Sequence, residues 1–159
     1  MKRLIGVLCL LLFVGGIASA QTQGYIFYAP GEIRAEGHSA FMMHFGGGGK
    51  YIAKNGLGAG AELGILGPKA HFTDACSAMF SLNGYYEVNK SNKVRPFLTG
   101  GWDRTFWHNS EANWGNFGGG ITYWAREGLG ATVEFRDHVH NEQGMTFHVL
   151  TVRFGLSFK

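Results

Sequence analysis

The sequence predicts an all-β fold, an eight-stranded antiparallel up-and-down β-barrel. Three observations lead to this prediction. Apolar residues alternate with polar or small ones over most of the chain, turn residues separate the alternating segments, and no apolar run after residue 20 is long enough for a transmembrane helix. The length of 159 residues and the 45% hydrophobic composition suit a single domain.

The first twenty residues have the pattern of a secretory signal peptide. Residues 1–3 are Met-Lys-Arg, residues 4–14 are apolar, and residues 18–20 are Ala-Ser-Ala, a small-residue cleavage site. We therefore expect a signal peptide at residues 1–20 and one mature barrel domain at residues 21–159.

The alternation is clearest near the carboxyl end. Within 148–158 the even positions from 150 to 158 are apolar, and the odd positions from 151 to 157, including Arg153, are polar or small. The same period of two runs through 57–65 and 129–135, where one face consists of Leu, Ala, Val, Ile and Phe. Helical spacing fits none of these segments, so we expect a strand in each.

Weaker alternation predicts the remaining strands. They are expected at 41–52, 78–88, 94–107 and 114–124, with 25–29 as an eighth strand whose phase the sequence does not reveal. Their number is even, so both ends of the domain should lie on the same side of the barrel.

The predicted connections differ in length. Asn55-Gly56 predicts a tight hairpin, and 89–92 and 126–128 are short polar connections. Longer, more charged loops are expected around 31–37, 68–76, 108–113 and 139–144. Alternation of short and long connections is typical of membrane barrels with periplasmic turns and external loops.

The apolar face indicates that the barrel spans a membrane. A soluble barrel around an apolar ligand would carry its charges outside. Here the face opposite Glu62, Glu134 and Arg153 is made of aliphatic and aromatic residues, which is too apolar for water. A closed barrel also pairs every backbone group within the sheet, as lipid requires. We therefore expect the outer surface to contact outer-membrane lipid.

Five segments resemble small bacterial outer-membrane β-barrel domain proteins of the OmpA-like eight-stranded group. They are GAGAELG at 58–64, FSLNGYY at 80–86, RPFLTGG at 95–101, NFGGGITYW at 116–124 and EFRDHV at 134–139. The resemblance implies this fold, an outer-membrane location and insertion by the barrel assembly machinery through the C-terminal strand. It implies no catalytic residue. Such barrels usually finish on an aromatic residue, whereas here Lys159 follows Phe158.

The strand phases place eight charged residues on the inward face. These are Lys50, Glu62, Glu87, Arg95, Asp103, Glu134, Arg136 and Arg153. Side chains just fill the interior of an eight-stranded barrel, so the four positive and four negative charges must pair or meet water. The sequence therefore predicts a lumen charge network in a filled barrel. A gate or narrow pore is the alternative interpretation.

No cofactor or metal site is expected. The glycine runs at 46–49 and 118–120 lack the spacing of a phosphate-binding loop. His138 and His140 alternate on one side of a strand end, which is a weak metal signal. We expect solvated loop positions for His38, His71, His108, His138 and His140. Cys76, the single cysteine after residue 20, is expected to be a small apolar filler.

An enzyme is the less favoured alternative. His108-Asn109-Ser110 is similar to the His-x-Ser portion of the site in lipid A deacylase barrels, but no carboxylate is placed by the sequence to orient the histidine. Removal of Lys2 and Arg3 from 14 basic residues leaves 12 against 11 acidic ones, so the charge gives no argument for a nucleic-acid partner. We expect a non-enzymatic structural or surface-interaction protein whose ligand the sequence does not name.

Overall fold

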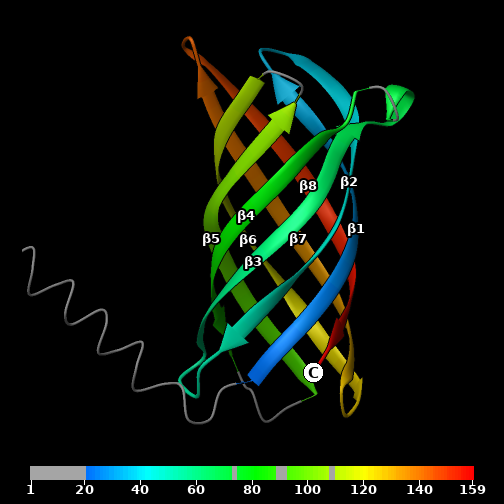
Figure 1. Cartoon of the computed structure of the whole chain (residues 1–159), viewed down its shortest axis with the longest axis vertical. Coiled ribbons are helices and arrows are strands. Elements are labelled where there is room, and N and C mark those ends of the chain that lie inside the picture. The colour runs from blue at the N-terminus through cyan, green and yellow to red at the C-terminus, as the bar shows by residue number, and fades with distance from the viewer. Residues whose placement is uncertain (1–20, 73–74, 89–92, 108–109) are drawn as a thin grey trace, which may run out of the picture.

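The structure is a computed structural model that describes residues 21–72, 75–88, 93–107 and 110–159. Eight antiparallel strands pair in chain order, and the eighth pairs with the first to close the barrel. Figure 1 shows the strands strongly tilted against the long axis, with the start of the first strand and the C-terminus at the same end. We call this the lower end and the opposite one the upper end. The predicted fold class is confirmed.

The elements follow one another without a crossover. The strands are β1 (Gln21–Ala35), β2 (His38–Ile52), β3 (Leu57–Pro68), β4 (Ser77–Glu87), β5 (Val94–Trp107), β6 (Ser110–Arg126), β7 (Leu129–Glu142) and β8 (Met145–Phe158). A short 3-10 helix, η2 (Lys69–His71), follows β3 at the upper end. Within the described ranges, the structure contains no helix suited by length and apolarity to crossing a membrane.

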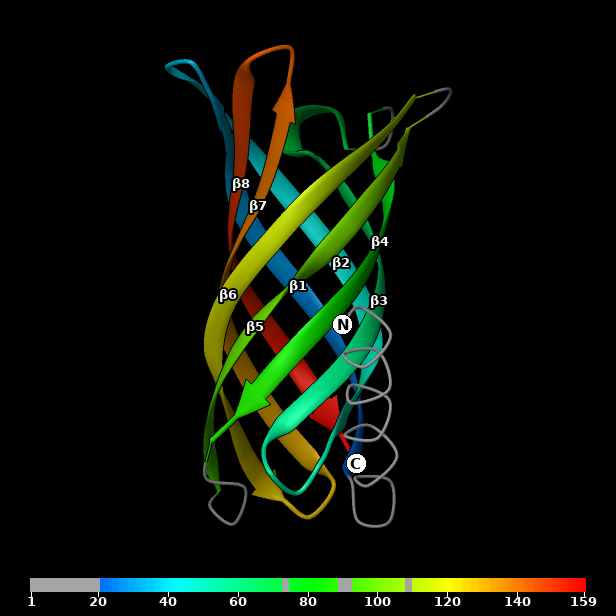
Figure 2. The same cartoon turned by 90° about the vertical axis from the view of Figure 1, so that its left-hand side faces the viewer.

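Two of the predicted upper loops are wrong, and the chain there turns tightly. Glu36-Gly37 joins β1 to β2, and Gln143-Gly144 joins β7 to β8. All four turn residues have positive φ (44°, 82°, 49° and 86°), the requirement of a type I′ hairpin turn. Apart from these turn residues, the residues that suggested loops at 31–37 and 139–144 belong to the ends of the strands, which extend to the upper end of the barrel (Figure 2). The four strands that meet at these turns, with 14 or 15 residues each, are longer than the roughly 9 to 11 residues that cross a bilayer.

The other connections agree with the sequence in part. β6 begins at Ser110, so the loop expected over 108–113 is also wrong, and residues 108–109 lie outside the described part. The β3–β4 connection is longer, as expected. At the lower end Leu57 donates its backbone N–H to Asn55 Oδ1 at 3.1 Å, and Gly56 has φ of 91°. Residues 89–92 are not described.

The predicted inward and outward faces are found in the barrel wall. Leu63 is 69% exposed and Val133 50%, whereas their neighbours Glu62 and Glu134 are buried. The first strand, whose phase the sequence left open, turns Gln23, Phe27 and Ala29 inward. Large apolar side chains exposed around the wall include Ile26, Phe45, Leu98, Phe117, Ile121, Phe135, Phe154 and Leu156. This belt is far more apolar than a surface in water.

Two apolar layers lie across the lumen. Towards the upper end, buried side chains from five strands pack together: Met42, Leu66, Met79, Trp114 and Val149. Towards the lower end, Ile52, Tyr85 and Phe97 form a smaller cluster. Charged and polar side chains lie between the two layers and also below the second one, so the central charges have an apolar layer on each side, whereas the lowest ones lie next to the lower opening.

We predict that the two faces respond differently to a buried charge. Val133→Arg places a guanidinium in lipid and should destabilise the barrel by about 2 to 4 kcal/mol if the site is near mid-membrane. Thr132→Arg should act through lumen packing, because the Thr132 hydroxyl contacts those of Thr122 and Ser157 at 2.9 and 3.0 Å. A polarity-sensitive label on a cysteine should report lipid at 133 and lumen at 132. The reverse result would contradict the assigned faces.

Candidate functional site

All eight inward charges named from the sequence lie inside the barrel, and none is more than 7% exposed. They come from six strands, β2 to β8 without β6. They do not form one continuous set. The contacts divide them into a central group around Glu62, a lower group around Glu87 and an upper group around Asp103.

The central group is built on one carboxylate. Arg153 Nη1 donates to both oxygens of Glu62 at 2.9 Å. Arg136 Nη1 lies 3.2 and 3.1 Å from the same two oxygens, and the Tyr25 hydroxyl donates to Oε2 at 2.9 Å. Arg136 also donates through Nε to Glu134 at 2.5 Å. Glu62 on β3 is therefore linked across the lumen to β1, β7 and β8.

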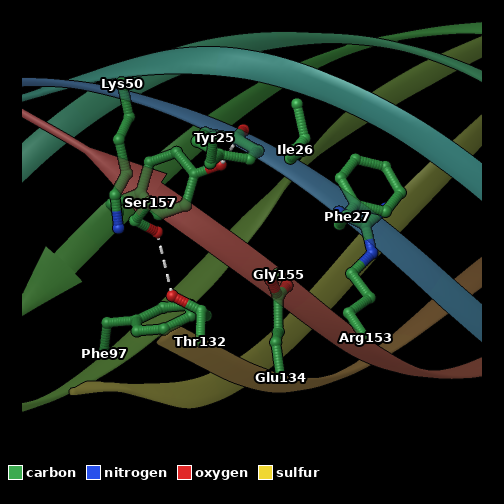
Figure 3. Close-up of a pocket in the computed structure, with 11 residues that line it drawn as sticks. Tyr25, Ile26, Phe27, Lys50, Phe97, Thr132, Glu134, Arg153, Gly155 and Ser157 are labelled. Carbon is green, nitrogen blue, oxygen red and sulfur yellow. Dashed lines mark hydrogen bonds between the residues drawn. The ribbon is translucent and has the colours of Figure 1, made fainter. Parts of the chain in front are cut away.

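Aromatic rings complete the packing of the central group. The Arg153 guanidinium lies 4.1 Å from the centre of the Phe27 ring, and Figure 3 shows the two side chains side by side. The hydroxyls of Tyr25 and Tyr85 are 3.0 Å apart. The space left between these residues, bounded also by Glu134 and drawn in Figure 3, amounts to about 20 Å³, which is room for about one water molecule.

The lower group shares one carboxylate between two cations. Arg95 Nη1 donates to Glu87 Oε1 at 3.1 Å and to Gln21 Oε1 at 2.9 Å. Lys50 Nζ lies 3.7 Å from Glu87 Oε2. The same ammonium is 4.7 Å from the centre of the Phe97 ring, which belongs to the lower apolar layer. Lys50 thus reaches through that layer towards the lower end.

The upper group differs from what charge counting suggested. Asp103 is fully buried, and its oxygens contact Asn116 Nδ2 and His138 Nδ1, each at 2.7 Å. No Lys or Arg of the described residues forms an ion pair with Asp103. Asn116 also donates to Asn83 Oδ1 at 2.9 Å. The four positive and four negative lumen charges therefore do not all pair with one another, because Asp103 contacts an imidazole and an amide instead.

His138 was expected in a solvated loop, and that expectation is wrong. Strand β7 continues to Glu142, so His138 has the same inward phase as Glu134 and Arg136 and is fully buried. The alternation of even positions after Glu134 was the signal that could have revealed this. His44 is also buried, with Nδ1 3.4 Å from Arg153 Nη2.

The other histidines expected in loops lie at the upper end wherever the structure describes them. His38 and His71 are exposed, and His140 Nδ1 lies 2.7 Å from the Asn113 carbonyl oxygen. In the part of the chain that the structure describes, no three His, Cys, Asp or Glu side chains are grouped to hold a metal. His108 and Asn109 lie outside the described residues, and Ser110 is exposed at the start of β6.

Several lumen partners escaped the sequence reasoning. They are Gln21, Tyr25, His44, Asn83, Asn116 and His138. None of these side chains is Lys, Arg, Asp or Glu, so counting charges on the inward face did not identify them. The sequence also did not show which residues of β1 face inward. Small residues also matter, since a Cβ at Gly130 would lie 3.0 Å from Trp124 Cε3. This contact explains how the large Trp124 side chain fits inside the wall.

We predict a graded loss of stability on neutralising three glutamates. Glu62→Gln removes the carboxylate shared by Arg136 and Arg153 and should cost about 3 to 5 kcal/mol of unfolding free energy. Glu134→Gln should cost less, because Arg136 keeps Glu62. Glu142→Gln, at an exposed upper-end site, should change stability by no more than about 0.5 kcal/mol. Urea unfolding in lipid vesicles measures this order. Equal costs for Glu62→Gln and Glu142→Gln would contradict the central role of Glu62.

Comparison with known proteins shows similarity in fold. No family model matches the chain, and no curated protein matches its sequence. Neisserial surface protein A superposes with a TM-score of 0.69 at 11% identity, covering 89% of this chain and 99% of that chain. The outer membrane enzyme PagL gives a TM-score of 0.58 at 14% identity, covering 82% of this chain and 97% of that chain.

A third similar structure is Ail, the attachment invasion locus protein of Yersinia pestis, in complex with the heparin analogue sucrose octasulfate. Its TM-score is 0.55 at 11% identity, covering 88% of this chain and 99% of that chain. These identities establish likeness of fold only. The chain has the fold of a small bacterial outer-membrane β-barrel of the OmpA-like, eight-stranded type.

Proposed function

We propose that this protein resides in the bacterial outer membrane and has a structural or surface-interaction role, with a filled lumen that does not conduct. The exposed apolar belt supports the location, because a closed barrel with an apolar wall is stable only in lipid. The lower end, which holds both termini of the barrel domain, would face the periplasm, and the upper end would face the outside.

The observation that carries the proposal is the Glu62 cluster enclosed by two apolar layers. Two guanidiniums and a tyrosine hydroxyl from three other strands converge on this carboxylate. The free space beside them holds about one water molecule. A continuous aqueous path would require these buried contacts to open, which supports a scaffold rather than a channel.

The upper end is the proposed interaction surface. A groove of about 400 Å³ lies there between the β1–β2 turn and β8. It is lined by Glu32, Arg34, Ala35, Glu36, Gly37, His38, Ser39, Thr146 and His148. Charged and polar side chains of both signs suit a hydrophilic partner. The names of Neisserial surface protein A and of the Ail complex support a surface role by analogy of fold.

We propose this role without enzymatic activity. The similarity to PagL is one of fold, and folds of this kind carry both enzymes and binding proteins. Mass spectrometry of lipid A from cells that produce the wild type or Ser110→Ala tests whether the protein has deacylase activity. We expect identical lipid A profiles, and acyl-chain loss dependent on Ser110 would favour the enzyme alternative.

We predict that cell fractionation recovers the mature chain in outer membranes. The protein should resist alkaline wash and be extracted by detergent, because its outer surface is apolar. Inner-membrane and periplasmic marker proteins serve as controls. Recovery of the folded protein in the soluble periplasm would overturn the proposed location.

We also predict little steady conductance when the purified protein is inserted in planar bilayers, because buried ion pairs and two apolar layers fill the lumen. A porin prepared in the same detergent controls for insertion. A large, regular conductance whose ion preference changes in Arg136→Ala would refute the filled lumen and favour the narrow pore.

A further inference from the structure

Positive charge exceeds negative charge at the lower end of the lumen. Below the central group, the cations Lys50 and Arg95 share the single carboxylate of Glu87. Lys159 follows β8 and adds a third cation at the same end. The carboxylate that would balance them, Asp103, lies in the upper group with His138. The uneven division of the eight lumen charges therefore leaves a local surplus of positive charge.

Two of these cations meet at one indole ring. Lys159 Nζ lies 3.9 Å from the centre of the Trp124 ring, and the Arg95 guanidinium lies 5.7 Å from it. Partial burial lowers the pKa of Lys159 below its usual value, and the nearby Arg95 charge lowers it further, while Glu87 acts in the opposite direction. The ring stabilises both cations but supplies no negative charge.

Buried hydrogen-bond donors without an acceptor lie at the same place. Trp124 is 5% exposed, and its Nε1–H, which can only donate, has no acceptor among the described residues. Gln23 is fully buried, and within the described part neither its amide nitrogen nor its amide oxygen has a hydrogen-bond partner. Gln23 on β1 lies next to Lys159, because β1 pairs with β8 and Gly24 is opposite Phe158. A buried donor left unpaired is costly, so the Trp124 Nε1–H points to a missing acceptor, and the Gln23 amide nitrogen offers a second donor.

The lower rim has the same sign of charge. The described charged residues in or next to its turns are the exposed cations Lys54, Lys93 and Arg126 and one acid, Glu127. These side chains would attract an anion towards the opening without binding it specifically. Specific contacts would come from the exposed Lys159 at the opening and from Arg95, Trp124 and Gln23, which are buried.

We propose that the lower mouth of the barrel is an oxyanion-binding site that takes a phosphate group. Surplus cations supply charge, and the Trp124 indole and Gln23 amide supply directed N–H donors, which is the chemistry that phosphate oxygens require. The phosphate group comes either from a soluble phosphate ester or from a phospholipid headgroup. This site is separate from the upper-end surface and does not depend on the role proposed there.

The test uses the indole N–H signal of Trp124 in the mature protein in a non-ionic detergent. The protein is labelled with 15N-tryptophan, and the signal is assigned by its loss in Trp124→Phe. Sodium phosphate is titrated at constant ionic strength, with chloride as the replaced ion. We expect a saturable shift of this signal, because a bound phosphate accepts the indole N–H.

Matched variants separate binding from general electrostatics. Lys159→Gln should weaken phosphate binding at least about fivefold, since it removes a cation at the site. Lys54→Gln removes the same charge from a turn at the same end but no specific contact, so it should weaken binding by less than about twofold. Retention of the compact, heat-modifiable form on electrophoresis confirms that each variant is folded.

Two further arms identify the source of the phosphate. A shift with glycerol 3-phosphate in detergent assigns a soluble ester, and a shift in nanodiscs of phosphatidylglycerol but not phosphatidylcholine assigns an anionic headgroup. Either result supports the site. Absence of a shift in every arm, a response that never saturates, or equal weakening by Lys159→Gln and Lys54→Gln would overturn the proposal.

Discussion

The lumen of this barrel depends on the carboxylate of Glu62. An eight-stranded barrel has an interior that side chains must fill, and a charge within it is stable only beside opposite charge and hydrogen-bond donors. Glu62 receives Arg136 and Arg153, and the Tyr25 hydroxyl completes its partners. Because these residues come from strands far apart in the chain, the same contacts that neutralise the carboxylate also hold opposite walls of the barrel together.

The other polar groups of the lumen follow from that arrangement. Arg136 and Arg153 are committed to Glu62, so Asp103 is left to His138 and Asn116 in the upper half. In the lower half, the carboxylate of Glu87 pairs with both Lys50 and Arg95. A lumen that is neutral by count is therefore polarised along its axis, with its surplus cations near the end that would open to the periplasm. The upper apolar layer lies above the Asp103 and Glu62 groups and the lower one lies between the Glu62 and Glu87 groups, so the central contacts stay out of bulk water.

The sequence predicted which residues form the inner and outer faces of the barrel wall, but not which side chains contact one another in the lumen. Alternation around Leu63, Val133 and Phe154 distinguishes the two faces because lipid and lumen place opposite demands on neighbouring residues. The alternation failed as a guide above the apolar belt. Outward-facing strand residues such as Arg34 are polar there, so the sequence pattern of a strand looks like that of a loop. His138 was misplaced for that reason. Which residues meet across the lumen depends on closure and strand tilt, so the contacts of Glu62 could not be derived from spacing.

The most direct test of this account is a distance measurement inside the folded barrel in lipid. Solid-state NMR dipolar recoupling between the 13C-labelled carboxylate of Glu62 and the 15N-labelled guanidinium of Arg153 reports whether the two groups touch, with Arg104→Lys as a control for labelled arginine at the exposed upper end. The account predicts strong coupling, since Nη1 lies 2.9 Å from both carboxylate oxygens. No measurable coupling in a folded, membrane-inserted sample would contradict a lumen organised around Glu62.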